Sequence, residues 1–190
     1  MSLFPMFLKL DGQRALVVGA GRVGETKIRG LLLAGARVRV VAPRATPRVA
    51  AWARAGRIDW AERPFRADDL RGALLAVVAT GSEELNDRIA KMARRKKILV
   101  NVVDDPPRCD FYYPAVVRRG SLVVAISTEG RSPALARRLR QHLERSLAPE
   151  LGRAVEQLGR ERDRLSSESI HPGQKRRALL RMARQIPLGR

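Results

Sequence analysis

Residues 19–24, which read GAGRVG, have the types and spacing that bind a nucleotide pyrophosphate. An apolar segment leads into them, and a segment of helical character, 25–34, leads out. Gly19, Gly21 and Gly24 let the backbone turn tightly from strand to helix and approach a pyrophosphate closely. The helix start then offers free N–H groups and a partial positive charge to the anion. The segment therefore predicts a nucleotide-binding loop, although a tight turn without a ligand would use the same residues.

The ribose end of this predicted site lacks its usual acid. Dinucleotide-binding folds commonly place an acidic residue at the end of the second strand, roughly 20 residues beyond the glycines. Pro43 and Arg44 stand there in this chain, and the next acid is Asp59. Either backbone groups near Pro43 hold the ribose, or Arg44 meets a 2′-phosphate and the cofactor is NADP. We also assign Thr80, which follows another apolar segment, to the cofactor site.

A pair of carboxylates, Asp104 and Asp105, follows the apolar segment 98–103. In open parallel sheets ligands bind just outside the carboxyl ends of the strands. A carboxylate placed there can take a proton from a substrate during hydride transfer. The two aspartates could equally cap a turn before the prolines that follow. The residues alone therefore make Asp104 a catalytic candidate and leave a purely structural role open.

A third polar segment, 127–133, reads STEGRSP and precedes a predicted helix. Its hydroxyls, glycine and arginine suit a carboxylate or a phosphate group. An ordinary capped loop has the same composition. The candidate substrate-binding residues in and after this segment are Thr128, Arg131, Ser132 and Arg137. The two histidines show no metal-ligand spacing, so we predict no metal site.

Alternating strand-like and helical segments predict the fold. Strand-like segments lie at 15–18, 37–41, 58–61, 74–79 and 98–103, and helical segments at 25–34, 47–55 and 83–95. Such alternation implies parallel strands with right-handed crossovers. The strands are almost continuously apolar, which fits a sheet buried on both faces by helices. The class is therefore α/β, with a Rossmann-like parallel sheet.

The pattern changes after about residue 113. A hairpin is expected over 114–126, and a helix runs from Ser132 and Pro133 to about residue 147 because Ser suits the N-cap and Pro the first turn. Two further helices are expected at 149–165 and 175–185, separated by a loop at 166–169 and a break at 171–173. The expected domains are 1–113 (NAD-binding, Rossmann-like), 114–147 (hairpin and helix, dimerisation) and 148–190 (C-terminal helical region). So small a hairpin unit buries little core, so we expect it to pack against the sheet domain or a second subunit.

The composition bounds the possible partners. The net charge is +19, from 38 basic and 19 acidic residues, and it is spread over both halves of the chain. Such charge can bind nucleic acid, attract a small polyanionic substrate, or belong to a solvated surface. All eight aromatic residues lie at or before Tyr113, so the basic last third has no base-stacking side chain. We therefore expect no nucleic-acid partner.

Two further features of the composition concern the compartment. Cys109 is the only cysteine, which excludes an internal disulfide and fits a reducing cytoplasm. No apolar run approaches the roughly 20 residues that span a bilayer, so we expect no membrane partner.

These motifs, in this order, resemble one family: the precorrin-2 dehydrogenase module of sirohaem biosynthesis. That module is the N-terminal part of bacterial sirohaem synthase, and it also occurs as a free-standing enzyme and as a yeast bifunctional dehydrogenase/chelatase. The matching residues are FPMFL at 4–8, the glycine segment with Lys27, NVVD at 101–104, Phe111, Pro114-Ala115 and SPALAR at 132–137. The likeness covers about residues 3–150 and continues more loosely to the C-terminus.

The resemblance implies NAD-dependent oxidation of precorrin-2 to sirohydrochlorin by a homodimer. Substrate and product carry eight carboxylates, which would give the diffuse positive charge a purpose. The resemblance makes Asp104 the acid/base group, and it places cofactor contacts at Arg22, Val23, Pro43 and Arg44. The family usually lacks the ribose-binding acid, so NAD remains compatible with its absence here.

Two positions depart from common family patterns. Gly24 is often alanine in the family, and we expect either residue to be small enough for helix–strand packing. Thr128 replaces a serine that some members carry, so regulation attributed to that serine is not carried over.

Two other functions remain open. Some relatives also insert Fe2+ into sirohydrochlorin in the same cleft, which makes a bifunctional dehydrogenase/ferrochelatase the nearer alternative. A non-catalytic, nucleotide-sensing nucleic-acid-binding protein is the alternative from another class.

No methyltransferase domain follows Arg190 in this sequence, so we expect a stand-alone oxidation step. The main hypothesis requires Gly21 and Asp104 to face one crevice rather than opposite sides of the sheet.

Overall fold

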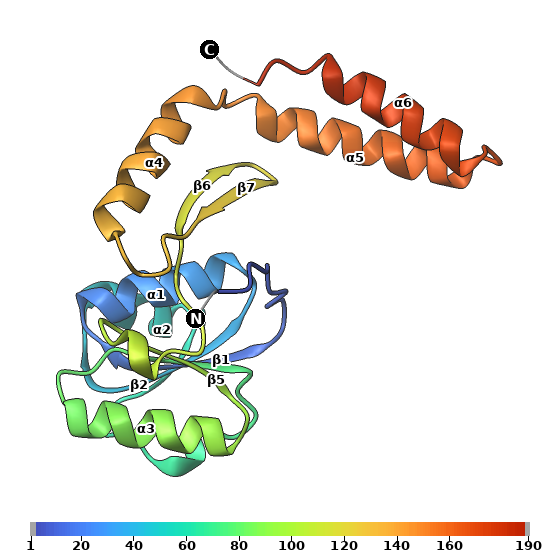
Figure 1. Ribbon diagram of the computed structural model, residues 1–190. Helices are drawn as coiled ribbons and strands as arrows, with labels where there is room; N and C mark the ends of the chain where they lie inside the picture. Colours follow the sequence, from blue (N-terminus) through green and yellow to red (C-terminus); the bar gives the residue numbers. More distant parts are fainter. Residues whose placement is uncertain (1–2, 189–190) are drawn as a thin grey trace. The chain divides into compact units, whose positions relative to one another are not determined.

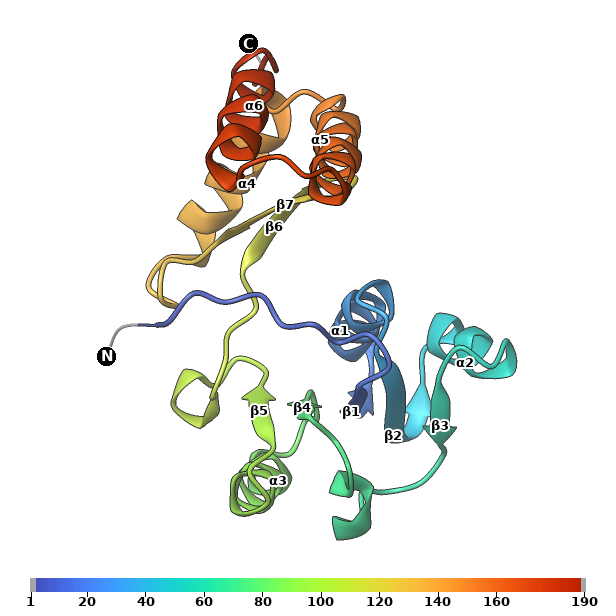
Figure 2. The ribbon, with the colours of Figure 1, turned by 90° about the vertical axis from the view of Figure 1, so that its right-hand side faces the viewer.

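The computed structural model describes residues 3–188, and the chain divides into two compact units between Tyr112 and Tyr113. The first unit is a parallel sheet of five strands with the spatial order β3-β2-β1-β4-β5. The strands are β1 (Arg14–Ala20), β2 (Arg37–Ala45), β3 (Asp59–Ala61), β4 (Leu75–Val78) and β5 (Leu99–Val102). Figure 2 views them in this order, from β5 on the left to β3 on the right.

Three helices cover the sheet, with α1 (Arg22–Leu33) and α2 (Pro47–Arg54) on one face and α3 (Glu83–Arg95) on the other (Figure 1). Successive side chains of a strand point to opposite faces, so Val17 of β1 packs with the α1–α2 side while Leu16 packs with the α3 side. Both are fully buried. The expected α/β class and the two-sided burial of the sheet are therefore confirmed.

The chain reverses its direction of growth across the sheet at β1. It first adds β2 and β3 on one side, and then crosses back to add β4 and β5 on the other. The carboxyl ends of β1 and β4 flank this switch point, which is where ligands bind in open parallel sheets. The segments at the carboxyl ends of β1, β2, β4 and β5 are therefore the candidates for a ligand site.

The second unit is an antiparallel hairpin with three helices. It contains β6 (Ala115–Arg119), β7 (Leu122–Ile126), α4 (Pro133–Ser146), α5 (Leu151–Ser167) and α6 (Pro172–Arg184). Among residues 113–188 the buried hydrophobic residues are Val117, Ala136, Leu151 and Leu165. The described part of this unit therefore has a small core of its own.

Several element boundaries differ from the sequence-based expectation. The helix expected at 25–34 begins at Arg22, because Gly21 already serves as its N-cap. The loop expected at 166–169 is wrong in its first half, since α5 continues through Ser167. The break expected at 171–173 is instead a helix start: His171 Nδ1 accepts a hydrogen bond from the backbone N–H of Gly173, 3.2 Å away, and Pro172 begins α6.

No helix within residues 3–188 combines the length and the apolar character needed to cross a membrane.

A buried aspartate holds the connection between β3 and β4. Asp69 lies in a short 3-10 helix (Ala67–Leu70), and its side chain is 2 % exposed. Its carboxylate accepts hydrogen bonds from Arg63 at 2.7 and 2.9 Å, from Arg39 at 3.2 Å and from the backbone N–H of Arg66 at 2.8 Å. The hydrogen bonds from Arg63, then Arg66 and Arg39, lower the pKa of Asp69 to about 2.

This network makes stability depend on pH. The pKa of Asp69 is lower in the folded state than in the unfolded chain, so its contribution is complete above about pH 4 and is lost as the pH falls toward 2. Asp69→Asn should therefore lower the free energy of unfolding by about 2 kcal/mol at pH 7, and by much less at pH 2.5. Urea unfolding at both pH values measures the difference, with the exposed neighbour Asp68→Asn as control. An equal loss at both pH values would exclude the ionic contribution of Asp69.

Candidate functional site

The carboxyl edge of the sheet brings together segments that are far apart in the sequence. Residues 19–24 span the end of β1 and the start of α1. Thr80 comes shortly after β4, and Asp104 shortly after β5. Pro43 and Arg44 are among the last residues of β2. Because the strands are parallel, all these segments lie at one edge. The predicted cofactor residues and the predicted catalytic residue therefore occupy the same edge of the first unit.

The three glycines of the loop have three different surroundings. Gly19 has φ +101°, and a Cβ added to it would lie 2.2 Å from the carbonyl oxygen of Ala79. A Cβ added to Gly24 would lie 2.2 Å from the carbonyl oxygen of Gly19. Nothing lies within 4 Å of a Cβ added to Gly21. The first and third glycines thus permit close packing of backbone on backbone, and the second leaves open space over the loop.

The surroundings of Gly24 correct one expectation. An alanine was expected to fit there, but its methyl carbon would overlap a backbone oxygen that cannot rotate away. In this chain, alanine at position 24 would require α1 and the glycine loop to move apart.

The N-terminus of α1 is left without a side-chain cap. Gly21 is its N-cap residue and offers no side-chain acceptor to the first N–H groups of the helix. In contrast, the hydroxyls of Thr46 and Ser82 cap α2 and α3. The N–H groups of the first turn of α1 therefore remain available to an anion, beside the exposed Arg22 and Val23. These features fit a dinucleotide pyrophosphate over Gly21.

An acid does lie beside the end of β2, but α1 supplies it. The hydroxyl of Thr46, the residue after β2, donates a hydrogen bond of 2.7 Å to the carboxylate of Glu25 in the first turn of α1. Arg48 lies 3.8 Å from the same carboxylate. Pro43 and Arg44 are exposed at the strand end. Sequence reasoning missed Glu25 because it searched for the acid only along the second strand.

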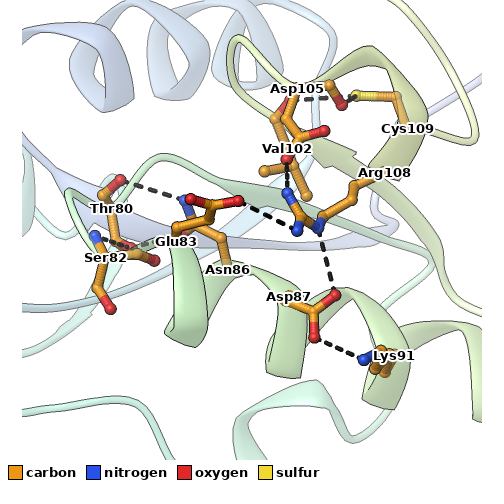
Figure 3. Close-up of polar contacts among 10 residues, drawn as sticks. All are labelled: Thr80, Ser82, Glu83, Asn86, Asp87, Lys91, Val102, Asp105, Arg108 and Cys109. Carbon is orange, nitrogen blue, oxygen red and sulfur yellow. Dashed lines mark hydrogen bonds and ion pairs between the residues drawn. The ribbon is translucent and has the colours of Figure 1, made fainter.

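Thr80 anchors the connection from β4 to α3 (Figure 3). Its hydroxyl donates to Asn86 Oδ1 at 2.5 Å and accepts from the backbone N–H of Ser82 at 3.2 Å. The amide of Asn86 donates back to the carbonyl of Thr80 at 3.3 Å. Thr80 thus fixes the loop whose preceding residue, Ala79, packs against Gly19.

Asp104 is exposed and has a left-handed backbone conformation, with φ +59°. It lies in a turn closed by a hydrogen bond of 3.3 Å from the N–H of Asp105 to the carbonyl of Val102. Left-handed residues other than glycine are uncommon, and aspartate is among those that tolerate the conformation best. Such residues gather at functional sites, where surrounding contacts maintain them.

Lys27 of α1 is influenced electrostatically by Asp104 of this turn. The side chain is partly buried, which lowers its pKa through desolvation, and the negative charge of Asp104 acts in the opposite direction. Lys27 is three residues beyond Gly24 on the helix that starts at the glycine loop. The sequence offered Lys27 only as a family match, without a role.

The four predicted substrate-binding residues belong to the second unit, before and within the first turns of α4. Thr128 Oγ1 accepts a hydrogen bond from the N–H of Ser132 at 3.2 Å, and Ser132 Oγ accepts from the N–H of Leu135 at 3.3 Å. Arg131 and Arg137 are exposed. The expected N-cap role of Ser132 is confirmed, and the two arginines lie within a few residues of it.

Two protein families match the chain in succession. The family described as "Putative NAD(P)-binding" matches residues 6–115, and the family described as "Sirohaem biosynthesis protein central" matches residues 119–146. The first match covers more than half of the chain.

Curated relatives carry names from the same pathway. "Siroheme synthase 3" of Aeromonas hydrophila is 41% identical over 177 residues, covering 93% of this chain and 38% of that protein. "Siroheme synthase 1" of Aeromonas salmonicida is 40% identical over 189 residues, covering 100% of this chain and 40% of the relative. The chain thus spans less than half the length of these relatives.

A solved structure, "SirC, precorrin-2 dehydrogenase", superposes with a TM-score of 0.81 at 27% identity. The match covers 95% of this chain and 89% of that one. Both units of the fold therefore occur together in a protein of similar length. The chain belongs to the NAD(P)-binding family of sirohaem synthase N-terminal modules and precorrin-2 dehydrogenases.

Proposed function

We propose that this protein oxidises precorrin-2 to sirohydrochlorin with NAD+ as the hydride acceptor. One observation carries the proposal: an uncapped, glycine-lined helix start and an exposed aspartate follow β1 and β5 at the same edge of the parallel sheet. The similarity to SirC over nearly the whole chain supports the same reaction.

The chain's own residues would bind the nucleotide as follows. The N–H groups of Arg22, Val23 and Gly24 bind the pyrophosphate, and Gly21 leaves the space through which it approaches. The segment at Pro43 and Arg44 borders the ribose. Bound there, NAD+ supplies the hydride acceptor of the reaction.

Asp104 would take the proton that leaves the macrocycle as the hydride departs. Its carboxylate is exposed, so a substrate can reach it, and its turn fixes the backbone that presents it. A general base placed in this way typically accelerates a reaction by about 10²- to 10⁴-fold.

We further propose that the second unit binds the substrate's carboxylates and forms a homodimer. Thr128, Arg131, Ser132 and Arg137 offer hydroxyl and guanidinium groups that suit carboxylates. The sparse core of the described hairpin and helices, residues 114–188, favours burial against a second copy. We place the protein in the cytoplasm, without a nucleic-acid or membrane partner.

Anaerobic incubation with precorrin-2 and NAD+ tests the proposal, because oxygen would oxidise the substrate without the enzyme. We expect the absorbance of sirohydrochlorin and of NADH to appear together, in equal amounts. A reaction without nucleotide is the control, and NADP+ in place of NAD+ tests the choice of cofactor. Absence of NADH formation with intact protein would contradict the proposed oxidation. Subsequent addition of Co2+ tests whether metal insertion exceeds the spontaneous rate.

A further inference from the structure

One guanidinium ties the turn that carries Asp104 to helix α3. Arg108 lies in a short 3-10 helix (Pro106–Arg108) four residues beyond Asp104. Its Nε lies 3.2 Å from Asp87 Oδ1, and one Nη lies 3.3 Å from Glu83 Oε1. The other Nη pairs with the carboxylate of Asp105. Figure 3 shows the three carboxylates converging on this one side chain.

One of the two acids on α3, Asp87, is itself held in place. Lys91 lies 2.7 Å from Asp87 Oδ2, one helical turn away, while Arg108 contacts the other oxygen of the same carboxylate. Lys91 and then Arg108 lower the pKa of Asp87, so this acid stays ionised near neutral pH. Asp87 thus presents a fixed negative charge to Arg108, and the more exposed Glu83 adds a second.

The turn needs such support because Asp104 has an unfavourable backbone conformation. A left-handed conformation is unfavourable for a residue other than glycine, and it persists only where neighbouring contacts determine it. The backbone N–H of Arg108 donates to the carbonyl of Asp105 at 3.1 Å, and the thiol of Cys109 lies 3.1 Å from the carbonyl of Val102. These local contacts shape the turn, and the Arg108 side chain attaches Asp105, the residue next to Asp104, to α3.

The geometry favours arginine over lysine at this position. A planar guanidinium presents five N–H donors in a fixed arrangement, whereas an ammonium is a single point of charge. Arg108 can therefore bind three carboxylates at once, those of Glu83 and Asp87 on α3 and that of Asp105 in the turn. The Arg108, Asp87 and Asp105 side chains are each no more than 33% exposed, so solvent screens these two pairs less than it screens the pair with the exposed Glu83.

We infer that Arg108 is a positioning residue for Asp104: by joining Asp105 to Glu83 and Asp87, it holds the Asp104 carboxylate in one orientation toward the crevice. This inference rests on the proposed role of Asp104. Arg108 acts through the turn.

A double-mutant cycle tests this inference. Arg108→Ala should lower kcat by about tenfold, with the Kd of NAD+ changed less than twofold, because the glycine loop is untouched. Arg108→Lys should restore part of kcat and ensures a result if the alanine variant does not fold. In an Asp104→Asn background the same Arg108 substitutions should change kcat less than twofold, since the group they position is already lost. Equal losses in both backgrounds would overturn the inference.

Hydrogen exchange gives a readout that needs no substrate. Arg108→Ala should speed exchange of the backbone amides of residues 103–105 and 108 by at least about fivefold, while exchange in β1 and α1 stays unchanged. Arg71→Ala, which breaks the exposed pair with Asp68 at 3.2 Å, is the matched control and should change neither exchange in the turn nor kcat. If the wild type proves inactive, the proposed function fails, and exchange still decides whether Arg108 holds the turn. Unchanged exchange of the amides of residues 103–105 and 108 would overturn the inference even in an active enzyme.

Discussion

Asp104→Asn should lower kcat for the oxidation of precorrin-2 by about 10²- to 10⁴-fold, while the Kd of NAD+ and the unfolding temperature stay nearly unchanged. An amide has the shape of a carboxylate, but it cannot take up the proton that must leave the substrate. Asparagine also tolerates a left-handed backbone about as well as aspartate does, so the turn at φ +59° is preserved. Alanine would remove the carboxylate and strain the turn together, which makes asparagine the cleaner substitution.

The measurement is single-turnover formation of NADH under anaerobic conditions, with NAD+ affinity determined separately. Glu84→Gln is the matched control, because it removes one exposed negative charge at the start of α3 without touching the turn. It should leave kcat within about twofold of the wild type. Full activity of Asp104→Asn would remove Asp104 from the mechanism and leave it as a turn residue.

Most of the sheet could be predicted because its strands are short apolar runs bounded by glycine or by polar residues. The expectation of a strand at 74–79 matches β4 at Leu75–Val78, where every residue is buried. Ser132 and Pro133 marked the start of α4 correctly, since capping depends on neighbouring residues alone. Residues 166–169 were expected to form a loop because of three serines, yet Leu165 is buried and packing extends α5 past it.

The residues that shape the site through distant contacts could not be predicted in the same way. Glu25 and Thr46 meet only because α1 and the end of β2 adjoin in space. Arg108 finds Glu83 and Asp87 more than 20 residues back along the chain. The sequence spacing of these partners does not distinguish them from polar side chains that face solvent. The sequence therefore indicates which groups can do chemistry, and the folded sheet decides which partners hold them.

Gly19→Ala should lower the stability of the fold, whereas Gly21→Ala should lower the affinity for NAD+, although both residues belong to one motif. Gly19→Ala would place its methyl carbon 2.2 Å from the carbonyl oxygen of Ala79, at a φ of +101° that only glycine adopts readily. We expect it to lower the free energy of unfolding by about 3 kcal/mol or more, because β1 and β4 must separate. Gly21→Ala meets nothing within 4 Å and should leave the unfolding temperature unchanged.

Gly21→Ala should instead weaken NAD+ binding by about tenfold or more, equivalent to about 1.4 kcal/mol. Its methyl group would occupy the open space through which a pyrophosphate reaches the N–H groups of α1. Calorimetric titration with NAD+ and thermal unfolding, measured on both variants, separate the two effects. Each variant serves as the control for the other, because one changes packing and the other changes access. Unaltered NAD+ affinity in a folded Gly21→Ala protein would place the nucleotide elsewhere. The hydride acceptor would then no longer lie at the edge of the sheet that carries Asp104, and the proposed mechanism would fail.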